Sequence, residues 1–302
     1  MKLLVYGALN IDLVYSVDHI VLPGETIRSH SLSKSAGGKG ANQAAAAAKA
    51  GMDVYMAGKI GGDGDFLLSL LNSYGVNTGN VSIWPGPTGN ALIQVDSSGQ
   101  NSIIIHAGGN GEITPAEAEA AIAGFGKDDI ISLQNEINLS TEIINAAVKA
   151  GMRICFNPSP WDEKIRKLPL KLVDIFVVNE IEGPFLAGLP AGTSTEKTLA
   201  KLTEMFPGKE IILTAGNKGA YYGCDSQREK GNIIKFPVVD TTGAGDTFTG
   251  YYLTARAKNY TVAEALRLAC KAASISVSRK GAMESIPLAE EVFLNDAQKA
   301  GG

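Results

Sequence analysis

Strand-length apolar runs alternate with helical stretches along most of the chain, and this alternation constrains the fold more than any other feature. We predict strands at residues 3–7, 54–61, 130–134, 154–157, 175–179 and 211–215, and helices at residues 39–51, 65–75, 141–151, 195–206, 244–258 and 261–278. The strand runs are continuously apolar, which is typical of strands that are buried on both faces. The pattern therefore predicts an α/β fold, with a doubly wound, mostly parallel sheet covered by helices on both faces.

Two segments break this alternation. Residues 11–35 alternate polar and apolar around a PGE turn without a helix, and residues 89–107 contain two strands joined by DSSGQN. We expect these two segments to form a small discontinuous β-sheet, a lid over a core of residues 1–10, 36–88 and 108–302. The alternative is that they are ordinary edge hairpins of the main sheet.

Composition excludes several classes of protein. The net charge of the 302-residue chain is −4, and no basic run suggests a nucleic-acid partner. No apolar run approaches the 18 residues that a membrane-spanning helix needs. Cys155, Cys224 and Cys270 are odd in number, and two of them lie in apolar segments. We therefore expect reduced thiols and a cytoplasmic protein.

Polar residues follow five of the predicted strands. They are Asn10 and Asp12, then Gln134 and Glu136, then Asn157, then Asn179, Glu180 and Glu182, and finally Thr214 and Gly216. Ligands of open α/β sheets bind beyond the carboxyl ends of the strands. The repetition predicts a binding site at this edge of the sheet.

The segment DTTGAGDTF, residues 240–248, opens a predicted helix. The backbone amides from Gly243 to Asp246 lack helical partners, and together with the helix dipole they favour an anion. An acid beside an anion is explained if the anion is the γ-phosphate of a nucleotide and Asp246 takes the proton of the attacking hydroxyl. The alternative is that Asp246 only stabilises the first turn of the helix.

The segment AGGKGANQA, residues 36–44, is a glycine-rich loop that opens another helix. Lys39 and Asn42 offer donors to a ligand, and the glycines allow its close approach. The loop matches neither the Walker A pattern nor G-x-G-x-x-G. A nicotinamide dehydrogenase on a doubly wound sheet is therefore disfavoured.

GGKGANQA near the N-terminus and DTTGAGDTF near the C-terminus together resemble the paired signatures of the ribokinase-like (PfkB) sugar kinases. The segments YGALNIDLVYSVDHIVLPGET, FNPSP, VVNEIE and SRKGAMESIP are similar to bacterial ribokinase members of that family, in the same order. The resemblance covers nearly the whole chain. It implies an ATP-dependent kinase that transfers the γ-phosphate to the primary hydroxyl of D-ribose and gives ribose 5-phosphate.

The resemblance also implies roles for individual residues. The residues implied for the sugar are Asn10, Asp12, Gly38, Lys39, Asn42, Glu136 and Asp246. Asp246 is the implied catalytic base, and Gly243, Ala244 and Gly245 form the implied anion hole. The residues implied for the nucleotide are Asn179, Thr214, Gly216 and Gly245. Glu182 is implied to manage Mg²⁺ through water. The implied loops for a monovalent cation, K⁺ in this family, contain Asp240, Thr242, Ser276, Arg279, Gly281 and Ser285, several of which act through main-chain carbonyl groups.

The resemblance further implies a homodimer in which the lid sheets make the contact. Met283 and Glu284 depart from the common family pattern beside the cation loop, so the details of that loop stay open. The same chemistry on deoxyribose, fructose, another sugar or a nucleoside is the first alternative function. A catalytically silent sugar-binding regulator is the second, and the intact Asp246 and anion turn argue against it.

Overall fold

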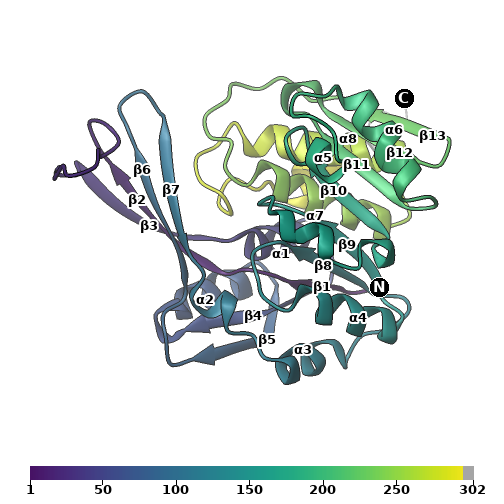
Figure 1. Ribbon diagram of the computed structural model, residues 1–302, viewed down its shortest axis with the longest axis horizontal. Coiled ribbons are helices and arrows are strands. Elements are labelled where there is room, and N and C mark those ends of the chain that lie inside the picture. The colour runs from purple at the N-terminus through teal and green to yellow at the C-terminus, as the bar shows by residue number, and fades with distance from the viewer. Residues whose placement is uncertain (295–302) are drawn as a thin grey trace.

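The computed structural model describes residues 1–294 and contains two sheets (Figure 1). The large sheet has nine strands in the order β13-β12-β11-β10-β9-β8-β1-β4-β5, and the small sheet has four in the order β3-β2-β6-β7. Figure 1 shows the strands of the small sheet extending away from the helix-covered body. The last eight residues of the expected core range lie outside the described residues.

The elements have the following bounds. The strands of the large sheet are β1 (Leu3–Tyr6), β4 (Val54–Gly61), β5 (Asn77–Trp84), β8 (Ile130–Gln134), β9 (Arg153–Asn157), β10 (Ile175–Asn179), β11 (Glu210–Thr214), β12 (Ala220–Cys224) and β13 (Gln227–Gly231). Those of the small sheet are β2 (Asn10–Ser16), β3 (Ser31–Gly37), β6 (Gly89–Val95) and β7 (Asn101–His106). The α-helices are α1 (Lys39–Lys49), α2 (Asp65–Ser73), α3 (Pro115–Ile122), α4 (Ser140–Ala150), α5 (Glu182–Leu186), α6 (Thr195–Met205), α7 (Ala244–Ala257) and α8 (Val262–Ser276).

Successive residues of each central strand pack into opposite hydrophobic clusters. In β1, Leu3 and Val5 pack with α1, α2, α7 and α8, whereas Leu4 and Tyr6 pack with α3, α4, α5 and α6. Because side chains alternate across a strand, a continuously apolar run buries one residue in each layer in turn. This explains the apolar strand runs and confirms the predicted α/β fold. All strands of the large sheet pair in parallel except β12 and β13.

Every strand and helix that we predicted in the core is present, with ends that differ by one or two residues. The sequence pattern missed β5, α3, α5, β12 and β13. Strands β5 and β13 are the two edges of the large sheet, and their residues are mostly exposed or half-buried. An edge strand can carry polar side chains on both faces, so the apolar signal on which the prediction depended is absent there.

The small sheet joins segments that are far apart in sequence. Strand β2 pairs with β3 in antiparallel and with β6 in parallel, and β6 pairs with β7 in antiparallel. Asn10, which we assigned to the core, is the first residue of β2. Its side-chain oxygen accepts a hydrogen bond of 2.7 Å from Asn110, whose own oxygen accepts the amide of Leu9 at 3.1 Å. Buried amide bonds therefore fix the base of the small sheet to the core.

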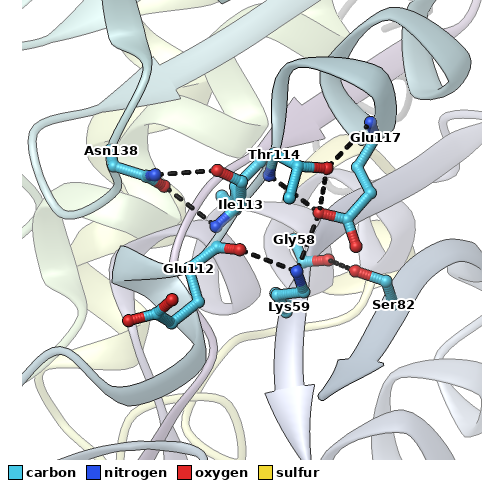
Figure 2. Close-up of polar contacts among 8 residues, drawn as sticks. All are labelled: Gly58, Lys59, Ser82, Glu112, Ile113, Thr114, Glu117 and Asn138. Atoms are coloured by element: carbon cyan, nitrogen blue, oxygen red, sulfur yellow. Dashed lines mark hydrogen bonds and ion pairs between the residues drawn. The ribbon is translucent and has the colours of Figure 1, made fainter.

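A second set of polar contacts fastens the chain where it returns from the small sheet (Figure 2). The buried ammonium of Lys59 on β4 donates to the carbonyl of Glu112 at 2.7 Å and to the carboxylate of Glu117 at 2.8 Å. Glu117 also closes a capping box with Thr114 at the start of α3. The side chain of Asn138 accepts from the amide of Ile113 and donates to its carbonyl group. These contacts hold α3 against the sheet.

The alanine run at residues 44–48 lies against α7 rather than against the sheet alone. A Cβ atom added at Gly250 would lie 2.5 Å from the Cβ of Ala46 and 2.7 Å from the amide nitrogen of Ala47. Small residues on both helices let their backbones approach closely. The contact matters for function because α1 and α7 carry the glycine-rich loop and Asp246.

All three cysteines are free, and Cys155 and Cys270 are buried as expected. Within residues 1–294, none of the helices has the length and apolar character that crossing a bilayer requires. The cytoplasmic location stays a prediction.

Candidate active site

The strand order reverses at β1. From β1 the chain adds β4 and β5 on one side, and it then returns to add β8, β9, β10 and β11 on the other. Such a switch point opens a crevice beyond the carboxyl ends of the two strands that flank it. The glycine-rich loop, Asn10 and Glu136 all follow or face β1 and β8, so the structure brings these predicted residues to one place.

Asp246 is buried, with an exposed fraction of 5%, and both of its carboxylate oxygens accept hydrogen bonds from α1. The side-chain N–H of Asn42 donates a hydrogen bond to Oδ2 at 3.1 Å, and that of Gln43 donates one to Oδ1 at 3.0 Å. The two signature segments, about 200 positions apart, thus meet in direct contact. A carboxylate that accepts two amide donors is held in one orientation.

Gln43 was not among the predicted site residues. Its side-chain oxygen accepts from Ser132 at 2.9 Å and from Gln134 at 2.8 Å, both on β8. All three side chains are buried. The available signal was a polar residue directly beside Asn42 in an otherwise alanine-rich helix, where a buried glutamine requires partners.

The turn before α7 has the geometry of an anion site. Gly243 adopts a positive φ of 71° at the N-cap, a conformation that favours glycine. Ala244 donates its amide to the carbonyl of Thr241 at a long 3.3 Å. The amides of Gly245 and Asp246 have no acceptor among residues 1–294. They and the helix dipole remain available to a negatively charged group.

Asp12 on β2 lies across the backbone of the glycine-rich loop. A Cβ atom at Gly37 would lie 2.2 Å from Oδ2 of Asp12, so only glycine at this position leaves room for the carboxylate. Burial raises the pKa of Asp12 from 3.8 to about 6, and the charges of Glu136 and Glu284 add to the effect. A carboxylate with this environment accepts hydrogen bonds from hydroxyl groups when it is ionised.

Lys39 lies among three acids. Its backbone amide donates to Glu136 at 3.0 Å. Burial alone lowers the pKa of the Lys39 ammonium, but the carboxylates of Asp246, Glu136 and Glu182 outweigh burial and raise it. Burial raises the pKa of Glu136, Lys39 opposes this, and Asp246 adds to it. The ammonium is therefore a fixed positive charge between the predicted sugar residues and the anion turn.

A cavity of about 620 Å³ opens on the other side of the anion turn. It contains the predicted nucleotide residues Asn179, Thr214, Gly216 and Gly245. Residues 233–236, Phe248 and Cys270 also line it. Sequence reasoning missed residues 233–236 because no element was predicted there, and it missed Phe248 and Cys270 because apolar residues of a predicted helix carry no sign of a ligand. Its mostly apolar wall beside a polar turn suits a flat base joined to phosphates. A cavity of about 640 Å³ between α3 and α4 contains none of the predicted residues.

Asn179, predicted for the nucleotide, and Glu182, predicted for Mg²⁺, lie close together in the chain but differ in their hydrogen bonds and burial. The side-chain oxygen of Asn179 accepts the amides of Ile181 and Glu182, at 2.9 and 2.8 Å. Glu182 is buried, with an exposed fraction of 6%, at the start of α5. Within residues 1–294, no group of three or more His, Cys, Asp or Glu side chains is arranged so that it could hold a metal ion. This donor set fits an ion held by phosphates and water rather than by a cage of protein ligands.

The two predicted cation segments are joined through Asp240. Its carboxylate accepts the amide of Thr242 at 2.9 Å and the amide of Gly281 at 3.0 Å. The Arg279 guanidinium pairs with Glu291. Because a guanidinium is itself a cation and has no acceptor, only the carbonyl group of Arg279 could be a cation ligand. The hydroxyls of Ser276 and Ser285 donate to nearby carbonyl groups, of Ala273 and Ala282. Carbonyl and hydroxyl oxygens of this kind suit a monovalent cation.

Comparison with known proteins places these features in a family. The model of the pfkB family carbohydrate kinases matches residues 1–289. The chain is 35% identical to ribokinase of Haemophilus influenzae, over 96% of this chain and 97% of that protein. It is 33% identical to deoxyribokinase of Salmonella typhi, over 96% of this chain and 97% of that protein.

The fold of a solved ribokinase structure is similar to that of this chain. The structure of Arabidopsis thaliana ribokinase complexed with ribose and ATP superposes with a TM-score of 0.87 at 33% identity, over 97% of each chain. Sequence and fold thus agree over nearly the whole length. The protein belongs to the pfkB family of carbohydrate kinases.

Proposed function

We propose that this protein is an ATP-dependent kinase that transfers the γ-phosphate of ATP to the primary hydroxyl of D-ribose. The observation that carries the proposal is the buried Asp246 carboxylate, which bonds the predicted sugar residue Asn42 and directly follows Gly245 of the nucleotide cavity. It is fixed by Asn42 and Gln43 and follows a turn with free amides. The similarity to ribokinases supports ribose as the acceptor.

In the proposed reaction Asp246 accepts the proton of the primary hydroxyl while the hydroxyl oxygen bonds to the γ-phosphorus. The bond from that phosphorus to the bridging oxygen breaks, and ADP leaves. The turn of Gly243, Ala244 and Gly245 would face the charge that develops on the phosphoryl oxygens, and the amides of Gly245 and Asp246 are free to donate to it. A positioned general base contributes roughly 10²–10⁴-fold to the rate, and holding both reactants in line contributes more.

The proposed sugar contacts follow from hydrogen-bonding capacity. Each sugar hydroxyl both donates and accepts. The Asp12 and Glu136 carboxylates accept from hydroxyls, and Lys39 and Asn42 donate to them. The Oδ1 atom of Asn42 is buried and has no partner within residues 1–294, so it is free to accept one more hydrogen bond. The side-chain oxygen of Asn10 already accepts a bond from Asn110, so its amide nitrogen is the group that would donate to a hydroxyl.

Two ions complete the proposal. Glu182 and Asn179 would hold Mg²⁺ through water, and the ion would neutralise phosphate charge. K⁺ would be held by the segments that contain Asp240, Thr242, Ser276, Arg279, Gly281 and Ser285. It would stiffen the turn before α7, because Asp240 links both segments to that turn.

We also propose that the small sheet covers the bound sugar and forms the contact of a homodimer. Ile103, Ile104 and Ile105 on its edge strand β7 have exposed fractions of 51%, 64% and 56%. The register pairs Asp12 with Ala91 and Ala91 with Ile105, so Ile105 lies on the same face as Asp12. An apolar edge of this kind is usually covered in a native protein.

The experiment is ADP release from ATP and Mg²⁺ in the presence of K⁺, with ribose, deoxyribose, fructose and nucleosides as acceptors and Asp246→Asn as the control. We expect ribose to give the highest kcat/KM and the control to lose nearly all turnover while it still binds sugar and ATP. Deoxyribose is the second candidate, because a deoxyribokinase is 33% identical to this chain. A higher kcat/KM for deoxyribose or a nucleoside would replace the acceptor and leave the chemistry in place.

No ADP release with any acceptor, together with calorimetric sugar binding, would favour a silent sugar-binding protein instead. Normal turnover of Asp246→Asn would remove Asp246 as the base.

A further inference from the structure

A chain of buried amide and hydroxyl groups is bonded to Asp246, and none of its members lines the nucleotide cavity. It runs from Oδ1 of Asp246 to Gln43 on α1, and from Gln43 to Ser132 and Gln134 on β8. The exposed fractions of Gln43, Ser132 and Gln134 are 1%, 0% and 0%. We propose that Gln43 is a positioning residue for the proton transfer, an inference that rests on the proposed function.

The hydrogen bonds allow one orientation of the Gln43 amide. Its oxygen accepts from the Ser132 hydroxyl and from the Gln134 amide nitrogen, so its nitrogen faces Asp246. In the reversed orientation an amide oxygen would meet the Asp246 carboxylate, and an amide nitrogen would meet the amide nitrogen of Gln134. Both contacts would be repulsive. Strand β8 therefore fixes the donor that points at Oδ1.

The two oxygens of Asp246 consequently have different roles. Oδ1 is bound by Gln43, whose nitrogen donates to it and whose oxygen already accepts two bonds from β8. Oδ2 is bound by Asn42, whose own oxygen is buried without a partner within residues 1–294. Asn42 can exchange its bond to Oδ2 for a bond to the sugar, whereas Gln43 cannot exchange its bond to Oδ1. The geometry assigns Oδ2 as the oxygen that takes the proton.

The backbone around Gln134 keeps this chain in place. A Cβ atom at Gly7, directly after β1, would lie 2.0 Å from Oε1 of Gln134 and 2.8 Å from the Cα of Gly40. Oε1 of Gln134 is also buried with no hydrogen-bond donor within residues 1–294. An unsatisfied buried oxygen costs stability, and native proteins retain such groups mainly where they serve a function. Gln134 donates to Gln43 despite this cost.

The test compares Gln43→Met with wild type. Methionine keeps the volume of glutamine and removes the donor to Asp246. A hydrogen bond to a charged group contributes enough that we expect kcat to fall roughly 10- to 100-fold. We expect the KM values and the calorimetric Kd values for ribose and ATP to stay unchanged, because Gln43 is directed at Asp246 and not at a ligand.

Two further variants separate positioning from loss of structure. Ser132→Ala removes one of the two donors that hold the Gln43 oxygen, and it should lower kcat by a smaller factor without a KM change. It also keeps the test decisive if Gln43→Met does not fold. Tyr252→Phe is the matched control, because Tyr252 is on the same helix as Asp246 and its hydroxyl donates to Glu210 at the start of β11, away from the site. It should lower the melting temperature and leave kcat unchanged.

The decisive measurement is the residual rate in the Asp246→Asn background. Because Gln43 acts through the Asp246 carboxylate, Gln43→Met should lower this residual rate no further. A second loss of similar size there would show a general structural role and overturn the inference, as would a wild-type kcat for Gln43→Met. If Asp246→Asn turns over normally, or wild type phosphorylates no acceptor, the proposed function has failed and the inference fails with it.

Discussion

At the scale of single residues, the protonation of Asp12 should control sugar binding. The pKa of Asp12 is raised from 3.8 to about 6 by burial and by neighbouring acids. Above pH 6 the carboxylate is ionised and accepts from sugar hydroxyls, and below pH 6 it is protonated and loses part of that capacity. We expect the KM for ribose to rise by up to about tenfold per pH unit as the pH falls below 6. Steady-state kinetics between pH 5 and 8 would measure it.

The control for this prediction is Asp12→Asn, which has no proton to gain. Its ribose KM should be high at every pH in the range and should not show the same rise. Glu136 also has a raised pKa and faces the same region, so a rise that persists in Asp12→Asn would assign the titration to Glu136. The KM for ATP serves as the internal reference.

At the scale of elements, the contact between α1 and α7 sets the distance between Asp246 and its two amide donors. Gly250→Ala places a Cβ atom 2.5 Å from the Cβ of Ala46, so the helices must separate. We expect a loss of about 1–3 kcal/mol in the free energy of unfolding, together with a lower kcat. Urea denaturation and steady-state kinetics would measure both changes.

Gly245→Ala is the matched control on the same helix, because a Cβ atom there meets nothing within 4 Å. Its unfolding free energy should be equal to that of wild type or higher by up to about 1 kcal/mol, because alanine favours a helix more than glycine does. Equal stability of the Gly250→Ala variant and wild type would contradict the close packing of α1 on α7.

Also at the scale of elements, Asp240 links the two predicted cation segments. Partial burial would raise the pKa of Asp240, but the amide bonds from Thr242 and Gly281 outweigh it and the pKa is lowered. The carboxylate therefore stays charged and ties the segments together. Replacing K⁺ with tetramethylammonium should reduce kcat without unfolding the protein. Unchanged turnover in a coupled assay would show that no monovalent cation acts there.

At the scale of the whole molecule, the small sheet is the part with least support from its surroundings. It extends from the body (Figure 1). Its edge strand β7 carries three exposed isoleucines. We expect a homodimer in sedimentation velocity experiments, and a monomer when Ile103, Ile104 and Ile105 are all replaced by serine. A monomeric wild-type protein at micromolar concentration would remove the dimer from the proposal.

Much of this architecture can be predicted from short stretches of the sequence. The central strands are apolar at every position because both faces are covered, and helices such as α7 and α8 follow clear breakers, so the layers could be predicted from residue order. The edge strands β5 and β13 could not, because solvent on their exposed sides removes the apolar pattern. The small sheet could be predicted from its hairpin, whereas its parallel pairing of β2 with β6 depends on tertiary contact.

The sequence by itself determined which chemistry the chain can carry: an acid at a helix start behind a glycine turn, and a glycine-rich loop with Lys39 and Asn42. Tertiary structure alone decided how these parts act together. Asp246 and Gln43 are about 200 positions apart, and only the close packing of α1 on α7 brings the amide donor to 3.0 Å from the carboxylate. Ser132 and Gln134 then fix that donor from a strand between them in sequence. Hydrogen bonds act over a few ångströms in space and leave no periodic trace along the chain, which is why the support of Asp246 could not be predicted from residue order.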